Sequence, residues 1–159
     1  MIIRNATYED LPEILLVYAY ARDFMRRTGN PHQWENAHPA KELLESDIDK
    51  GDLYVLYDGG IHAVFALIFG EDPTYGYIEG QWLNQDPYVT IHRIASAGSR
   101  SGMLGQCVTY ALSRCNNLRI DTHNDNFVMQ HLLNKHGFSR CGIIYLENGD
   151  PRIAYQITR

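Results

Sequence analysis

Apolar residues recur with helical spacing in two segments of the N-terminal third. After a short β-type run from Ile2 to Ala6, Thr7 offers an N-cap, with Asp10 three residues later. The positions that follow keep one apolar helix face, at Leu11, Ile14, Leu15, Tyr18 and Met25. Gly29-Asn30-Pro31 ends this helix, and the pattern predicts a second helix over 40–50.

The middle of the chain has the pattern and the turn residues of strands. Residues 52–57 and 61–69, joined by Asp58-Gly59-Gly60, predict a β-hairpin. A stretch rich in Gly, Pro and Tyr then continues through Trp82, and we expect it to be irregular.

Strands and helices alternate in the second half of the chain. The expected elements are a strand at 88–95, a small polar loop at 96–102, a helix at 103–114, a strand at 118–122, a helix at 126–135 and two strands at 140–146 and 152–158. We therefore expect a single domain over residues 1–159. Its class is α/β, with a mixed sheet that carries helices on both faces.

The composition is that of an ordinary soluble domain. Of the 159 residues, 45% are hydrophobic and 21% are charged, which excludes a disordered tail protein. The formal charge of −5 argues against a sequence-independent nucleic-acid binder, because that role requires Lys and Arg against several phosphates. The three cysteines form no metal-type pair, no apolar run approaches the roughly 20 residues of a membrane span, and the first residues do not resemble a secretion signal. We expect a cytoplasmic protein without a nucleic-acid or membrane partner.

Charge is distributed unevenly along the chain. Residues 1–86 carry a net charge of −9, residues 87–120 carry +4 from four arginines, and residues 121–159 are neutral. This distribution indicates a middle segment suited to an anion and an N-terminal half suited to a cation. Acidic surface helices that only serve solubility would give the same distribution.

The segment from Ser96 to Gly102 is the strongest candidate for ligand binding. It joins a strand to a helix start, where free backbone N–H groups and the helix dipole favour an anion. Gly98 and Gly102 would let the backbone approach phosphate oxygens, and Arg100 and Ser101 could donate hydrogen bonds. Neither the P-loop nor the Gly-x-Gly-x-x-Gly fingerprint is present, and Ser/Gly loops before helices are also common without a ligand.

From Tyr88 to Ile144 the chain resembles the GNAT superfamily of acyl-CoA-dependent N-acetyltransferases. The segments that carry the resemblance are YVTIHRIAS, AGSRSG, MLGQCVTYALSR, LRIDTH and NDNFVMQHLLNKHGFSRCGII. The N-terminal strand, helix and hairpin follow the family's usual order, so the resemblance spans essentially the whole chain. It implies a GNAT-like mixed, mostly antiparallel sheet, with acetyl-CoA as co-substrate between the splayed strands YVTIHRIAS and LRIDTH.

The resemblance also assigns residues to the cofactor. The end of the YVTIHRIAS strand would pair by backbone with the pantetheine, the next loop and helix start would hold the pyrophosphate, and a later helix would supply an asparagine. The expected set is Ile94, Ala95, Ser96, Arg100, Ser101, Gly102, Met103, Leu104, Gly105 and Asn126. We expect no metal, because His123, His131 and His136 lack a third ligand at useful spacing and the loop after Asp121 lacks the Gly and Glu of an EF-hand.

Three positions depart from the family pattern. Ser99 replaces the first residue of the loop signature Gln/Arg-x-x-Gly-x-Gly/Ala, and Leu104 replaces its last. Leu133 stands where many members carry the tyrosine that protonates the leaving thiolate. Tyr145, Tyr88 and Tyr20 are the candidate acids that remain.

His92 and Glu79 are the alternative general bases. His92 lies four residues before Ser96, on the strand from which family members often present a histidine or glutamate. Imidazole takes up a proton near neutral pH and could act directly or through a water. A strand histidine is equally often a core residue, and a loop glutamate such as Glu79 is usually only solvated.

The first helix and two aromatic loops are expected on the acceptor side. Tyr20, Trp34 and Trp82 are candidate walls for an amine, because aromatic faces can hold a cation. Each of these residues alone is more often a packing residue. The expected acceptor is a small-molecule or peptide amine, and an exposed last strand leaves a homodimer open.

Two functions are consistent with these features. The first is an N-acetyltransferase that moves an acetyl group from acetyl-CoA to a primary amine by direct attack, with a backbone amide near Ile94 polarising the carbonyl. The second is a non-catalytic acyl-CoA sensor or interaction module on the same fold. The missing helix tyrosine and the altered loop signature keep the second function open.

Overall fold

Eight strands form one mixed sheet in the computed structural model, which describes residues 1–159. The strands are β1 (Ile2–Asn5), β2 (Leu53–Tyr57), β3 (Ile61–Phe69), β4 (Glu79–Gly80), β5 (Val89–Ser96), β6 (Asn117–Thr122), β7 (Ser139–Tyr145) and β8 (Pro151–Thr158). Their order across the sheet is β1-β2-β3-β5-β6-β8-β7-β4, and every pairing except β5–β6 is antiparallel.

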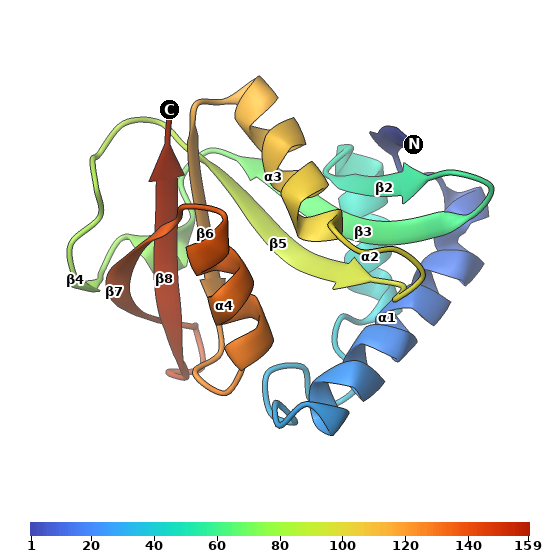
Figure 1. Cartoon of the computed structure of the whole chain (residues 1–159), viewed down its shortest axis with the longest axis horizontal. Coiled ribbons are helices and arrows are strands. Elements are labelled where there is room, and N and C mark those ends of the chain that lie inside the picture. The colour runs from blue at the N-terminus through green and yellow to red at the C-terminus, as the bar shows by residue number, and fades with distance from the viewer.

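Helices cover both faces of this sheet, as the sequence pattern predicts. They are α1 (Leu11–Arg27), α2 (Lys41–Lys50), α3 (Met103–Arg114) and α4 (Phe127–Lys135), with short 3-10 turns η1 (Tyr8–Asp10) and η2 (Pro73–Tyr75). In Figure 1, α3 and α4 lie in front of the sheet, where Cys107 and Leu133 enter the larger apolar core. On the opposite face, Ile14 and Tyr18 of α1 and Leu44 of α2 are fully buried in a second core. No helix has the length and apolar character that crossing a membrane demands.

The predicted elements agree with the structure to within two residues, except that Thr7 caps the 3-10 turn η1 and α1 itself begins at Leu11. The segment before Trp82 is less irregular than expected. Glu79 and Gly80 pair with β7 as the short strand β4. The two backbones come very close there, because a Cβ on Gly80 would lie 2.2 Å from the Cys141 carbonyl oxygen. This close approach depends on glycine, which a periodicity of apolar residues does not reveal.

The expectation of an exposed last strand is wrong. Strand β8 lies between β6 and β7, and its residues 152–157 are buried. The turn after Tyr145 folds β8 back along β7, while β6 pairs with the other side of β8. The edges of the sheet are therefore β1 and β4.

The central strands β5 and β6 diverge soon after they pair. Only Val89 and Thr90 of β5 have partners in β6. Further along β5 its register with β3 shifts opposite Phe65, next to Arg93, whose φ of +52° is unusual for a residue with a side chain. A bulge of this kind bends its strand, so β5 turns away from β6 and leaves the fork seen in Figure 1.

Three contacts hold the bulge in place. The Tyr18 hydroxyl of α1 donates a hydrogen bond to the Arg93 carbonyl oxygen at 2.6 Å. The Arg93 Nε and Nη2 atoms each donate to a carboxylate oxygen of Asp47 at 2.9 Å. The Asp47 side chain is only 4% exposed, so this is a buried two-pronged ion pair between α2 and β5. Both N-terminal helices are thereby attached to the bend.

We predict that Asp47→Ala lowers the free energy of unfolding by about 3 kcal/mol, because it leaves the Arg93 guanidinium, whose side chain is only 15% exposed, without a partner. Urea unfolding followed by circular dichroism measures this loss. The control is Asp23→Ala, which removes an exposed ion pair with Arg26 and Arg27 on α1 and should leave the urea midpoint almost unchanged. Equal losses in the two variants would contradict a special role for the buried pair.

Candidate functional site

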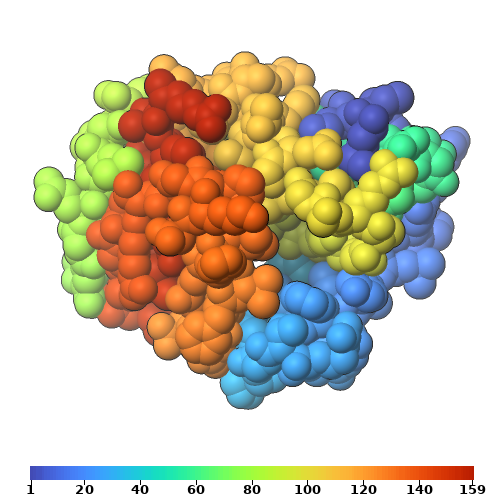
Figure 2. Space-filling model, in the orientation of Figure 1, coloured from blue at the N-terminus to red at the C-terminus, as the bar shows by residue number.

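A cavity opens where β5 and β6 diverge. It measures about 290 Å³ and is bounded by α1, by the segment from β5 into α3, and by α4. Figure 2 shows a hollow between the orange surface of α4, the yellow loop after β5 and the blue N-terminal helix region. The residues expected to bind the cofactor all line this cavity: Ile94, Ala95, Ser96, Arg100, Ser101, Gly102, Met103, Leu104, Gly105 and Asn126.

Apolar side chains form two walls of the cavity. Phe24 and Met25 of α1 contribute one wall, and Met129 and Leu132 of α4 contribute the other. Between them runs the β5 end with Ile94. A mostly apolar slot with few polar groups suits the extended, weakly polar part of a ligand.

The N-terminus of α3 has no side-chain cap. Its N-cap is Gly102, with φ of +78°, and no acidic residue lies in the first turn. In contrast, α4 is capped by Asn126, whose Oδ1 accepts a hydrogen bond from the Met129 N–H at 3.0 Å. The first N–H groups of α3 and its dipole are therefore available to an anion at this end of the cavity.

Of the four arginines in the basic window, only Arg100 lines the cavity. It forms an exposed ion pair with Asp58 at 2.7 Å, which lowers the pKa of that carboxyl. The other three make internal contacts, Arg93 with Asp47, Arg114 with Tyr110, and Arg119 with Trp82 and Tyr88. The suitability for an anion thus comes from the helix start and its loop, not from the charge of the whole window.

Tyr20 joins α1 to the loop after β5. Gly98 in that loop has φ of +77°, and a Cβ at this position would lie 2.3 Å from the Tyr20 hydroxyl oxygen. Only glycine permits both the backbone conformation and the close approach of the ring. Ser99 Oγ also lies 2.6 Å from His62 Nδ1 of β3, so the loop is held from two sides.

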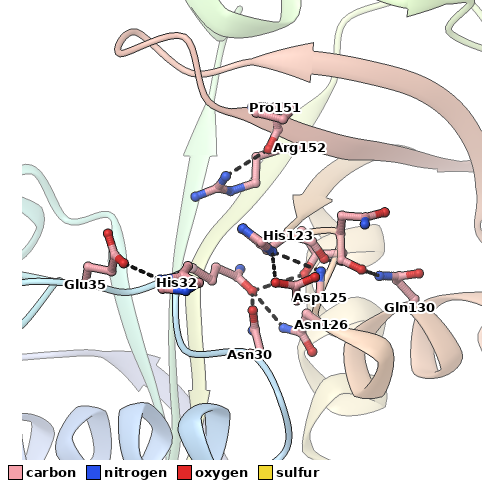
Figure 3. Close-up of polar contacts among 12 residues, drawn as sticks. Asn30, His32, Glu35, His123, Asp125, Asn126, Gln130, Pro151 and Arg152 are labelled. Atoms are coloured by element: carbon pink, nitrogen blue, oxygen red, sulfur yellow. Dashed lines mark hydrogen bonds and ion pairs between the residues drawn. The ribbon is translucent and has the colours of Figure 1, made fainter.

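The loop between α1 and α2 reaches across the fork to the start of α4. Gln33 Oε1 accepts hydrogen bonds from Asn126 Nδ2 at 2.9 Å and from Asn30 Nδ2 at 2.8 Å. Figure 3 shows Asn30 and Asn126 meeting in this cluster. Both polar groups of the Asn126 side chain are therefore engaged within the protein, one by Gln33 and one by Met129.

His92 forms a hydrogen-bonded pair with Asp72 on the sheet face opposite α3. Its Nε2 lies 2.7 Å from Asp72 Oδ2, and the two side chains are 23% and 16% exposed. Burial opposes the ionisation of Asp72, but hydrogen bonds from His92 and Thr74 lower its pKa to about 2. With Asp72 ionised and Nε2 donating to it, the second ring nitrogen of His92 is left to accept a proton.

A second half-buried carboxylate, that of Asp121, lies near this pair. The Tyr75 hydroxyl donates to Asp121 Oδ2 at 2.6 Å, and burial raises the pKa of Asp121 while the charge of His92 opposes that rise. The Tyr88 hydroxyl accepts a hydrogen bond from the Asp72 N–H at 2.7 Å. No three His, Cys, Asp or Glu side chains gather here or elsewhere in a way that could hold a metal ion.

Glu79 and Tyr145 contact each other rather than His92. The Tyr145 hydroxyl donates to Glu79 Oε1 at 2.5 Å where β4 pairs with β7, and this bond raises the pKa of Tyr145. Neither residue lines the cavity. Leu133, at the position of the family's tyrosine, is fully buried in the core.

The three aromatic residues expected on the acceptor side have different surroundings. Tyr20 lines the cavity. Trp34 packs on Tyr18, with 5.7 Å between ring centroids. Trp82 is only 5% exposed, and its Nε1 donates to the Tyr75 carbonyl oxygen at 3.0 Å, so it holds the segment before β5 in place.

Asp72, Asp121 and Gln33 were not anticipated from the sequence. Asp72 could have been noticed, because Asp-Pro-Thr is a typical start of a helical turn and Asp72 Oδ1 accepts from the Thr74 N–H at 2.8 Å. That signal explains Oδ1 but not the bond of Oδ2 to His92, which lies 20 residues further along the chain.

We predict that Asp72→Asn destabilises the protein by roughly 2 kcal/mol at neutral pH and by almost nothing near pH 2. The pKa of Asp72 is lower in the folded protein than its ordinary 3.8, so its contribution is complete above that pH and is lost as the pH falls towards 2. Urea unfolding of wild type and variant across this range measures the difference. A difference that stays constant down to pH 2 would contradict the assignment.

Neither the models of protein families nor the curated proteins give a match to this sequence. Solved structures do match it. A GNAT-family acetyltransferase from Streptococcus agalactiae is 34% identical, with a TM-score of 0.86 over 99% of this chain and 95% of that chain. Another from Listeria monocytogenes is 18% identical, with a TM-score of 0.72 over 99% and 94% of the two chains.

A more distant match is the NatB acetyltransferase complex bound to CoA and MES. It is 10% identical, with a TM-score of 0.66 over 99% of both chains. At this identity, as with the Listeria protein, the likeness concerns the fold. The Streptococcus protein shares sequence as well as fold over nearly its full length. The resemblance seen in the sequence is thereby confirmed: this chain is an acetyltransferase and belongs to the GNAT family.

Proposed function

We propose that this acetyltransferase moves the acetyl group of acetyl-CoA to a primary amine of a small molecule or peptide, by direct attack of the amine, in the cytoplasm. One observation carries the proposal. The cavity between the splayed strands reaches Ile94, and His92, with its ionised partner Asp72, lies two residues earlier on the same strand. The ligand slot and the proposed proton acceptor are thus both on β5, although the His92 side chain is not part of the cavity lining.

The lining of the cavity fits acetyl-CoA. The apolar walls from α1 and α4 would take the pantetheine chain, and the strand end from Ile94 to Ser96 would offer backbone groups to its amides. The uncapped start of α3 would hold the pyrophosphate, with Arg100 as an additional donor. CoA bound to the NatB complex, which shares this fold, is in keeping with the same use.

The bulge in β5 supplies the electrostatic part of the reaction. Where two residues of one strand oppose one of the next, a backbone group is left without a ladder partner. A backbone N–H near Ile94 would donate to the thioester oxygen as it gains negative charge. Acetyl-CoA supplies the activated acyl group.

Proton transfer is assigned to His92. Asp72 stays ionised, holds the imidazole by Nε2 and leaves Nδ1 to take the proton of the attacking amine, directly or through a water. The C–N bond forms, the C–S bond breaks, and the CoA thiolate leaves. We favour His92 over Glu79, because Glu79 is exposed at the sheet edge and bonded to Tyr145.

The structure offers no hydroxyl at the family's position for protonating the thiolate, because Leu133 fills it. A CoA thiolate is stable enough to leave as the anion and take its proton from solvent. We therefore assign no general acid. Tyr145 is a poor candidate, because its hydroxyl already donates to Glu79.

Release of free thiol from acetyl-CoA tests the proposal. We expect at least one member of a panel of polyamines, amino acids, aminoglycosides and peptide N-termini to raise thiol release above background. Calorimetry with CoA is the accompanying binding measurement. Binding without any turnover would replace the proposal by a CoA sensor on the same fold, and no binding would exclude both.

We predict that His92→Ala lowers kcat/KM by about 100-fold or more near pH 7 and by less at high pH, where free amine is abundant. The measurement is the pH profile of thiol release with the best amine of the panel. Glu79→Gln serves as the matched control and should leave the profile unchanged. If the profile changes with Glu79 and not with His92, the base has been assigned to the wrong residue.

A further inference from the structure

Arg152 on β8 is a buried cation without an ion-pair partner. The residue is only 6% exposed. Of its five N–H donors, one has a partner in the protein: Nη1 donates to the carbonyl oxygen of Pro151, the preceding residue, at 2.8 Å. Burial lowers the pKa of Arg152, and the charges of Asp121 and Asp150 oppose this effect without contacting the guanidinium. A buried guanidinium is normally paired, so the remaining donors of Arg152 are available to a ligand.

Arg119 shows what a structural arginine looks like in the same sheet. It is 3% exposed and lies between the rings of Trp82 and Tyr88, each 4.0 Å from its guanidinium carbon. Its Nη2 donates to the Asn84 carbonyl oxygen at 2.9 Å. Arg152 has no such aromatic contact and no bond that joins it to a distant part of the chain. Aromatic packing therefore accounts for the burial of Arg119, although its Nε has no hydrogen-bond partner, and no such packing accounts for Arg152.

The sheet register places Arg152 on the same face as His92. Thr90 of β5 pairs with Arg119 of β6, so two residues later His92 lies level with Asp121, which pairs with Ala154 of β8. Arg152 is two residues from Ala154 along β8, or about 7 Å, and side chains two residues apart share a face. It lies towards the open end of the fork.

Residues from both sides of that fork lie around Arg152. In Figure 3 its guanidinium extends away from β8 towards the region that holds His32 of the α1–α2 loop and His123 after β6. Burial and then neighbouring positive charges, Arg152 among them, lower the pKa of His38 in that loop and of His123. The charge of Arg152 is therefore felt on both sides of the fork.

We propose that Arg152 binds a carboxylate of the acceptor, so that the acceptor is a small amine that also carries a carboxylate. This inference rests on the proposed function. The Asp72–His92 pair and Asp121 would receive the amino end, and the planar guanidinium would hold the two oxygens of the acid end. Arg152 lies about two residues along the sheet from the level of His92 and Asp121, and this spacing would separate the amino end of the acceptor from its acid end.

Matched amine pairs test the inference. The probes are glycine, β-alanine, γ-aminobutyrate and L-phenylalanine, each compared with its carboxamide. In wild type we expect kcat/KM for the best acid to exceed that of its amide. In Arg152→Gln we expect kcat/KM for the acid to fall about 10- to 100-fold, mainly because KM rises, while kcat/KM for the amide changes less than twofold. Because the amides are weaker bases, the ratio of acid to amide is compared between wild type and variant, where that difference cancels.

Two further variants keep the result interpretable. Arg140→Gln removes an exposed arginine of the neighbouring strand β7 and should alter neither substrate. Arg152→Lys keeps the positive charge but lacks the planar guanidinium with its two parallel donors. It should retain part of the preference for the acid over the amide. Thermal melting checks that each variant folds.

The inference is overturned if Arg152→Gln lowers kcat/KM equally for acid and amide, or for neither. The acetyltransferase proposal stands in both cases. Should no amine be acetylated, the proposed function fails separately. The inference is then decided by calorimetry of the same pairs with CoA-saturated protein. Acid binding that requires Arg152 supports it, and the absence of any difference between acid and amide refutes it.

Discussion

The bend of β5 at Arg93 is the constraint on which the site depends. A non-glycine residue with positive φ is unfavourable by about 1–2 kcal/mol, so the bend persists only because other contacts stabilise it. Tyr18 bonds to the Arg93 carbonyl and Asp47 to its guanidinium, and both partners are buried. Two helices and a strand therefore share one junction. If β5 ran straight it would continue to pair with β6, and no cavity would open between them.

The same bend separates two kinds of chemistry. On the side of α3 and α4, the cavity presents the backbone N–H groups of the α3 start and apolar side chains. On the opposite face, the groups are His92 with Asp72, then Asp121 and Arg152, all in partly or fully buried positions. In the proposed reaction, a thioester entering from one side would meet an amine from the other. The division of the sheet into these two faces follows from the alternation of side chains along β5 and β6.

The net charge of each segment did not show which charges lie in the site. The positive window from 87 to 120 contributes one arginine, Arg100, to the cavity, and the others stabilise the sheet and its flanking segments. Arg152, a buried arginine without an ion-pair partner, lies in the segment whose net charge is zero. Sums of charge report composition, whereas the field in a site depends on which charges are neutralised by contact.

The sequence alone determined the elements, pointed to the family and named ten residues that line the cavity. Those features depend on local signals: apolar periodicity, glycines at a helix start, and residues close together in the chain, as from Ile94 to Gly105. The proposed acceptor side was decided by tertiary structure. Asp72 reaches His92 across 20 residues of sequence, and Gln33 reaches Asn126 across 93. Such contacts, and whether Arg152 has a partner, depend on strand order and burial, which no local pattern encodes.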